Sequence, residues 1–188
     1  MSTADRSEHM TYVALLHSVG IGGGGRLRMS DWRHAMESAG LRNPRTLGAT
    51  GNALFEGRRT SIETLTRHLE RAFALAFGRH VDIILRDAGG WRRLAERNPF
   101  PAESRRAAAN VLVRVMRSPL DPDVAAGLLR RARQGECLRV VAGDLWIHFG
   151  QPPNQSRLLS ALTTQRLGVG TLRNWNTVRR LHEMLAKT

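Results

Sequence analysis

Two short apolar runs constrain the fold most strongly, because the same order of structural signals follows each of them. Residues 10–16 and 110–116 are rich in β-forming side chains and too short for buried helices, so both are predicted as buried strands. Each run is followed by a helix signal and then by two strand signals. The sequence therefore predicts a β-α-β-β unit that occurs twice, near residues 10–56 and 109–149, as a repeat of element order rather than of residue identity.

Helix-start and turn signals occur at the positions that the β-α-β-β order requires. Ser30 is a good N-cap for a first helix, and Asp121-Pro122 joins an N-cap acid to a proline at the first helical position. Glycine-containing turns at Thr50-Gly51-Asn52 and Gly143-Asp144 separate the paired strands. Two helices are predicted to close the chain, one beginning at Ser156 and one containing Val178, Leu181 and Leu185.

The expected fold is α+β, with two β-α-β-β (split β-α-β, ferredoxin-like) modules in tandem and a C-terminal helical pair. We assign residues 1–9 to a disordered tail and 10–88 to the first ferredoxin-like module. Residues 89–108 form a linking helix and loop, and 109–188 form the second module with the C-terminal helices. The single Cys137 favours a reducing compartment. The polar N-terminus and the lack of long apolar runs predict a cytoplasmic protein without a membrane partner.

The charge balance indicates the class of partner. The chain has 29 basic and 16 acidic side chains, a formal charge of +13, and lysine occurs once, at Lys187. Arginine in place of lysine reflects coding bias, but such an exchange leaves the net charge unchanged. The excess predicts binding to nucleic acid or another polyanion. Aromatic residues make up only 5% and no RNA-recognition string is present, so stacking on bases is not indicated.

A glycine loop follows the first strand and formally matches G-x-G-x-x-G between Gly20 and Gly25. A dinucleotide site needs a helix that begins at the glycines and an acid at the tip of the next strand, and the sequence predicts neither. No cofactor is expected. Two interpretations stay open: a close-packed connection, or an anion-binding loop in which glycine amides and arginines hold a phosphate. The latter would use Gly22, Gly23, Gly24, Arg26 and Arg28.

Two further polar segments have both a structural and a functional interpretation. Thr50-Gly51-Asn52 is either a plain turn or part of a polar site beside the glycine loop. Arg173-Asn174-Trp175-Asn176-Thr177 is either a cap with a packed tryptophan or an anion site at a helix N-terminus. No metal site is expected, because no H-x-x-x-H pair occurs and Cys137 stands alone. His17, at the end of the first strand, is the best-placed candidate for a catalytic acid or base.

These segments together resemble a bacterial family called domain of unknown function 1697. The resemblance rests on Tyr12-Val13-Ala14-Leu15-Leu16 with its glycine loop, Met29, Gly51-Asn52 with Phe55, Asn98-Pro99-Phe100, Ser156-Arg157-Leu158, and Gly170-Thr171 with Arg173-Asn174-Trp175-Asn176-Thr177-Val178. It implies a duplicated ferredoxin-like fold without an established activity. It also implies one shared polar site. The chain departs from the family pattern at the loop, where His17-Ser18-Val19-Gly20-Ile21-Gly22-Gly23 replaces a segment with arginine and asparagine. The family also favours serine at the position of Thr50 and lysine at the position of Arg157.

Three functions remain open from the sequence. The first is a cytoplasmic protein that binds nucleic acid or another polyanion. The second is an enzyme or small-ligand binder for a phosphorylated or carboxylated metabolite. Its anion pocket would combine the glycine loop, residues 50–52 and residues 173–176, with His17 as the acid–base group. The third is a protein-interaction module in which the polar motifs are only caps and turns. We rank polyanion binding first because of the charge excess.

Overall fold

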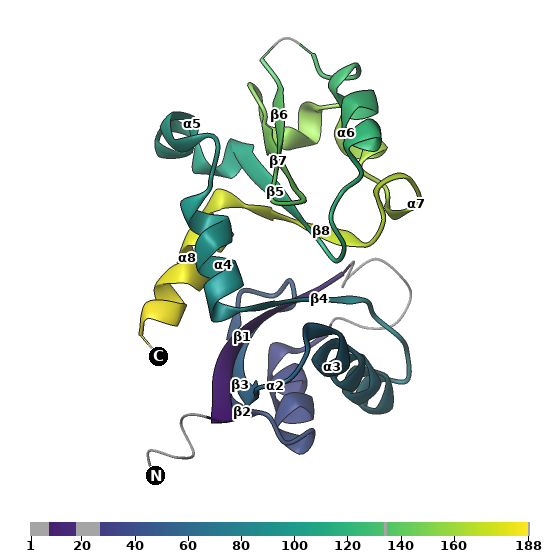
Figure 1. Cartoon of the computed structure of the whole chain (residues 1–188), viewed down its shortest axis with the longest axis vertical. Coiled ribbons are helices and arrows are strands. Elements are labelled where there is room, and N and C mark those ends of the chain that lie inside the picture. Colours follow the sequence, from purple (N-terminus) through teal and green to yellow (C-terminus); the bar gives the residue numbers. More distant parts are fainter. Residues whose placement is uncertain (1–7, 18–26, 134, 188) are drawn as a thin grey trace. The chain divides into compact units, whose positions relative to one another are not determined.

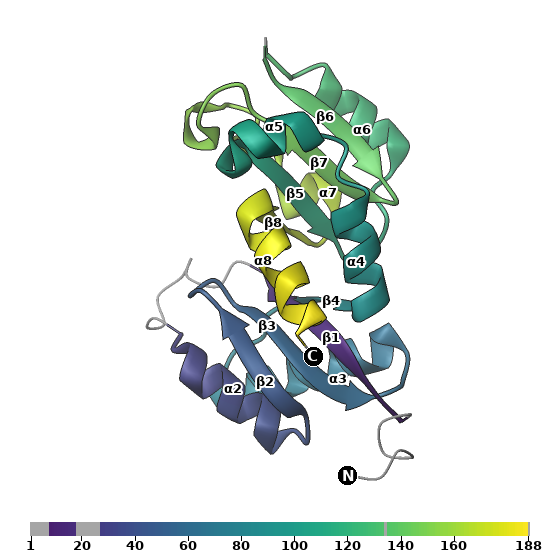
Figure 2. The same ribbon diagram turned by 90° about the vertical axis from the view of Figure 1, so that its left-hand side faces the viewer.

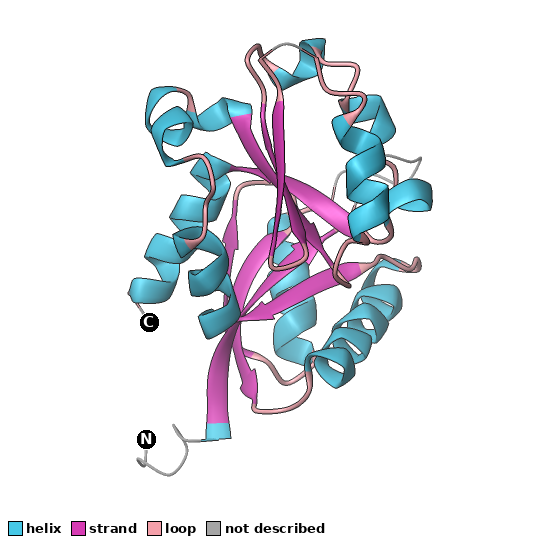
Figure 3. Cartoon of the chain, turned by 45° about the horizontal axis from the view of Figure 1, so that its top comes forward, coloured by secondary structure: helices cyan, strands magenta, loops and turns pink. Residues whose placement is uncertain are grey.

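The computed structural model describes residues 8–17, 27–133 and 135–187 of the 188-residue chain. Most of the predicted tail and residues 18–26 of the glycine loop lie outside these ranges. The chain divides into two compact units, Met1–Arg92 with Arg180–Thr188, and Arg93–Arg179. Each unit contains its own four-stranded antiparallel sheet, drawn in magenta in Figure 3. The linking role predicted for residues 89–108 stays a prediction.

The first unit follows the order β-α-β-β-α-β, and its strands can be followed in Figure 2. Its elements are β1 (His9–Leu16), α2 (Met29–Ser38), β2 (Arg42–Leu47), β3 (Asn52–Arg58), α3 (Ile62–Phe77) and β4 (Ile83–Asp87). The strands lie in the order β2-β3-β1-β4, and each pairs with its neighbours in antiparallel fashion. This is the split β-α-β arrangement, in which β3 separates β1 from β2.

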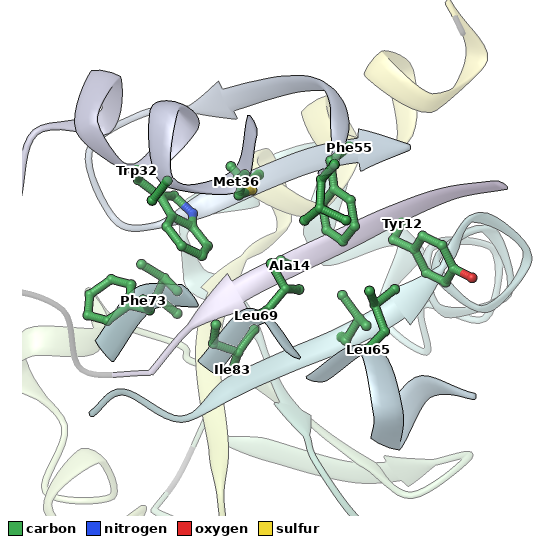
Figure 4. Close-up of a cluster of buried hydrophobic side chains, with 14 of the residues drawn as sticks. Tyr12, Ala14, Trp32, Met36, Phe55, Leu65, Leu69, Phe73 and Ile83 are labelled. Atoms are coloured by element: carbon green, nitrogen blue, oxygen red, sulfur yellow. The ribbon is translucent and has the colours of Figure 1, made fainter. Parts of the chain in front are cut away.

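One face of this sheet packs against α2 and α3, as Figure 4 shows. Alternate residues of β1, Tyr12, Ala14 and Leu16, enter this core because side chains alternate across a strand. From the helices come Trp32 and Phe73, whose rings meet edge to face with centroids 5.3 Å apart. Val13 and Leu15, which alternate with these residues, are buried as well, which explains why this part of the strand is continuously apolar.

The second unit repeats this topology. Its strands are β5 (Val111–Met116), β6 (Cys137–Val141), β7 (Asp144–His148) and β8 (Gly170–Asn174), in the order β6-β7-β5-β8. The helix α6 (Pro122–Leu129) follows β5, as α2 follows β1. The other helices are α4 (Ala88–Glu96), α5 (Pro101–Arg106), α7 (Thr164–Leu167) and α8 (Trp175–Ala186), all labelled in Figure 1. The prediction of two tandem split β-α-β modules in an α+β fold is confirmed.

The segment between β7 and β8 differs from the prediction. A single helix was expected from Ser156, but the chain forms 3-10 turns at Pro153–Gln155 and Leu159–Ala161 and then the four-residue α7. Leu158, Leu162 and Leu167 enter the core, so their spacing imitates a helix face. Low helix propensity around Thr163 disfavours one continuous helix, and Gly168, with φ +80°, ends α7. β8, which follows, was not expected.

A buried arginine compensates for the missing helix. Arg114 lies in β5 on the core side of the sheet and is 3% exposed. Its Nη1 donates to the carbonyl of Leu162 at 3.1 Å, and its Nη2 donates to that of Gly168 at 2.9 Å. Burial lowers the pKa of this guanidinium. By strand register Arg114 corresponds to Ala14 of β1, where the regular helix α3 satisfies its own backbone.

Candidate functional site

The glycine-loop candidates divide between described and undescribed residues. Gly22, Gly23, Gly24 and Arg26 lie outside the described ranges. Arg28 is exposed and occupies the N-cap position of α2, so the helix begins two residues before the start predicted from Ser30. His17 follows β1 directly and is half-buried, and its backbone nitrogen donates to the carbonyl of Asp82 at 2.9 Å.

Thr50-Gly51-Asn52 closes the turn between β2 and β3. Asn52 is 2% exposed, and its Nδ2 donates to the Leu47 carbonyl and to the Thr50 hydroxyl, both at 3.0 Å. Gly51 has φ +75° and its carbonyl accepts from the Leu16 nitrogen at 3.0 Å. The turn therefore lies at the same end of the sheet as His17. The amide of Asn52 stabilises the turn from inside, which is the structural role that the sequence left open.

The predicted residues of the second unit form the end of β8 and the start of α8. Arg173 is 8% exposed, and its Nη1 donates to the Thr171 hydroxyl at 2.7 Å and the Leu172 carbonyl at 2.8 Å. Burial lowers its pKa to about 10, so the group is charged at neutral pH. Oδ1 of Asn174 accepts from the nitrogen and the hydroxyl of Thr177, both at 3.0 Å, and so caps α8.

The other predicted residues of this unit are Trp175, Asn176 and Arg157. The ring of Trp175 lies 6.0 Å from that of Trp146, and Asn176 is half-buried. Arg157 is exposed, and its carbonyl accepts from the Ser160 hydroxyl at 2.7 Å. Arg157 and residues 173–177 belong to the second unit, whereas His17, Arg28 and residues 50–52 belong to the first.

The strand registers align a few matching residues of the two modules that the sequence alone did not pair. β4 pairs with β1 as β8 pairs with β5, which aligns Leu85-Arg86-Asp87 with Leu172-Arg173-Asn174. Both arginines donate from Nη1 to the carbonyl of the preceding leucine. Gly51-Asn52 and Gly143-Asp144 match in the same way, since both glycines have positive φ and both polar residues begin the third strand. A few matched positions therefore accompany the repeat of element order.

A surface groove of the second unit gathers arginines that the sequence did not bring together. Two adjoining depressions of about 480 and 320 Å³ lie beside α6 and α7, and both are lined by Val124, Arg166 and Leu167. Arg130 and Arg131 line the first depression and Arg117 lines the second. We call these four exposed arginines with Val124 and Leu167 the arginine groove. The helix α6 ends at Leu129, and Arg130 and Arg131 lie in the turn beyond it.

The arginine groove is positively charged. Among the described residues, no carboxylate pairs with Arg130, Arg131 or Arg166. The acid in the lining, Asp121, caps α6 by accepting from the Asp123 nitrogen at 2.7 Å. The unit as a whole carries 14 arginines and 6 acidic side chains, a net charge of +8. Arg130, Arg131 and Arg166 can therefore hold an anion in the groove without competition from a described carboxylate.

The comparisons with known proteins agree with this architecture. A sequence model of the family described as protein of unknown function DUF1697 matches residues 10–146. The chain belongs to the DUF1697 family. The DUF1697 match includes β1 to most of β7 and ends before the Arg173–Thr177 segment. No functionally curated protein matches the chain.

The DUF1697 fold also occurs in a solved structure. SP0830, a conserved bacterial protein from Streptococcus pneumoniae, is similar with a TM-score of 0.72 and 21% sequence identity. The similarity covers 95% of this chain and 99% of that one, so it includes both modules. At this identity the likeness shows the fold alone. Among the described segments of our DUF1697 chain, no helix combines the length and apolar character needed to cross a bilayer.

Proposed function

We propose that this DUF1697 protein binds a nucleic-acid strand through the arginine groove of its second unit. The observation that carries the proposal is the set of Arg130, Arg131 and Arg166, exposed around one groove and not paired with any described carboxylate. A guanidinium matches a phosphate with two parallel N–H donors, so arginine is well suited to a phosphate backbone. A polymer presents several phosphates at once, as the groove presents several guanidinium groups.

The lining predicts how the strand is recognised. The described lining residues of the two depressions include no aromatic side chain, so bases have no ring to stack on. Contacts to phosphates carry no sequence information. We therefore expect binding without sequence preference and with a strong dependence on salt. If all four arginines contact phosphates of a single strand, log K falls against log salt with a slope of about −3.

The test is fluorescence anisotropy of a labelled oligothymidine with the full chain, from about 50 to about 200 mM NaCl. Replacing Arg130 and Arg131 together by glutamine should weaken binding by about tenfold or more and make the slope shallower by about 1.4. The matched control is R105Q with R106Q, which removes the same charge from exposed positions of α5, away from α6 and α7 in Figure 1.

Three outcomes would contradict the proposal. The first is the absence of binding at low salt, and the second is an equal loss in the groove and control variants. The third is complete displacement of the oligomer by a mononucleotide, when the mononucleotide is added at a concentration equal to the total phosphate concentration of the oligomer. That outcome would favour the alternative of a small phosphorylated ligand. Circular dichroism of each variant checks that the fold is retained.

A further inference from the structure

Three side chains with metal-binding atoms meet in the first unit, away from any motif of the sequence. Glu70 lies on α3, and His80 and Asp82 lie in the segment between α3 and β4. One ligand atom from each lies within 4.8 Å of the other two, and His80 Nε2 is 3.5 Å from Asp82 Oδ1. The nine residues between Glu70 and His80 explain why no local spacing reveals the cluster.

The fold holds two of the three groups in place. Glu70 lies on the buried face of α3, and its Oε1 accepts from the Ile83 nitrogen at 3.0 Å. The carbonyl of Asp82 accepts from the His17 nitrogen at 2.9 Å, which ties its backbone to the end of β1. A hydrogen bond to a carboxylate oxygen, such as that from the Ile83 nitrogen to Glu70, orients a metal ligand.

The third group has freedom to adjust. Val81 is buried in the core, while the side chains of its neighbours His80 and Asp82 are 64% and 31% exposed. Two ligands on a tetrahedral zinc ion, each about 2.1 Å from the metal, are about 3.4 Å apart. The His80–Asp82 distance already has this value. Rotation of the exposed imidazole can shorten its separation from Glu70, and rotation of the partly exposed Asp82 carboxylate can bring that group closer, without moving the core.

We infer that Glu70, His80 and Asp82 bind a divalent transition-metal ion, with zinc the best-suited. One imidazole with two carboxylates gives nitrogen and oxygen ligands, and imidazole favours zinc and its neighbours over magnesium or calcium. Two carboxylates balance the double charge of the ion. Three protein ligands leave a fourth position for water, as in zinc sites that are open to solvent. The site is independent of the arginine groove, which lies in the other unit.

The experiment is isothermal titration calorimetry of the metal-free full chain with zinc chloride. A Cys137→Ser background removes the exposed thiol, which would otherwise compete for the metal. We expect one site, whose affinity falls by about tenfold or more in His80→Gln. The matched control is His34→Gln, because His34 is also exposed and lies 4.0 Å from a carboxylate, that of Glu37, in an i,i+3 pair. This control should leave the affinity unchanged.

A second variant separates metal binding from folding. Glu70→Gln keeps an oxygen that can accept from the Ile83 nitrogen but removes the charge of the ligand, so it should fold and bind zinc weakly. Zinc should raise the Tm of the parent and of His34→Gln, and it should not raise that of His80→Gln or Glu70→Gln. A parent that binds no zinc would overturn the inference, as would binding that persists unchanged in both ligand variants.

Discussion

Asp87 and Asn174 occupy the same position in the two modules, and each caps the helix that follows it. Oδ1 of Asp87 accepts from the nitrogen of Gly90, and Oδ1 of Asn174 accepts from that of Thr177, three residues further on in both cases. Each polar residue ends the fourth strand of its sheet and is followed directly by a helix. The Arg-Asn segment of the second module is therefore one of two copies of a strand-to-helix junction.

This junction leads to the first prediction. Asn174→Ala removes the acceptor for the Thr177 nitrogen and should destabilise the protein by about 1 kcal/mol. Asn174→Asp keeps an acceptor oxygen at a helix N-terminus and should cost much less. Urea denaturation followed by circular dichroism measures both. Equal losses in the two variants would show that the cap is not what Asn174 contributes.

The turn at Gly51 gives a second prediction with an internal control. A Cβ at Gly51 would lie 2.6 Å from Cβ of Leu16 in a backbone with φ +75°, so Gly51→Ala combines strain with overlap. We expect a loss of about 3 kcal/mol. Gly48 has φ +65° but nothing within 4 Å of its added Cβ, so Gly48→Ala should cost only about 1 kcal/mol. Equal losses of unfolding free energy in the two variants would argue against a steric overlap between the added Cβ of residue 51 and Leu16.

Arg114 provides a third prediction. Arg114→Met removes the donors to two carbonyls of the irregular segment, although it also relieves the burial of a charge. The lost hydrogen bonds exceed that relief, and we expect a loss of about 2 kcal/mol in unfolding free energy. Arg139 of β6 is exposed, so Arg139→Met should change stability by no more than about 0.5 kcal/mol. A neutral Arg114→Met would mean that the segment holds its conformation by apolar packing alone.

The fourth prediction concerns alkaline pH. Burial disfavours the charged form and lowers the pKa of Arg173 to about 10 in the folded protein, below that of an arginine in the unfolded chain. Above this pKa the unfolded chain keeps a proton that the folded protein has released, so stability rises with pH relative to a variant without the group. From pH 8 to pH 11 the wild type should gain about 1 kcal/mol over Arg173→Gln. If the unfolding free energies of the two proteins changed in parallel with pH, the burial of the Arg173 guanidinium would be contradicted.

Local signals in the sequence were enough for most of the elements. The apolar run at 110–116, the cap and proline at Asp121-Pro122 and the hairpin at Gly143 each act within a few residues. For the same reason, the β-α-β-β order could be predicted before any contact was known. The glycine and asparagine of residues 51–52 also carried their own turn signal.

The tertiary structure decided the rest. Leu158, Leu162 and Leu167 have the spacing of a helix, yet the segment stays irregular because Arg114, about fifty residues away, satisfies carbonyls that a helix would have used itself. Arg166 joins Arg130 and Arg131 only through the return of the chain beside α6, and His80 reaches Glu70 only because α3 ends at Phe77. Sequence patterns report what a residue does with its near neighbours. Packing determines which distant groups form a common charged surface, a hydrogen bond or a metal site, because those contacts form only when the chain has folded.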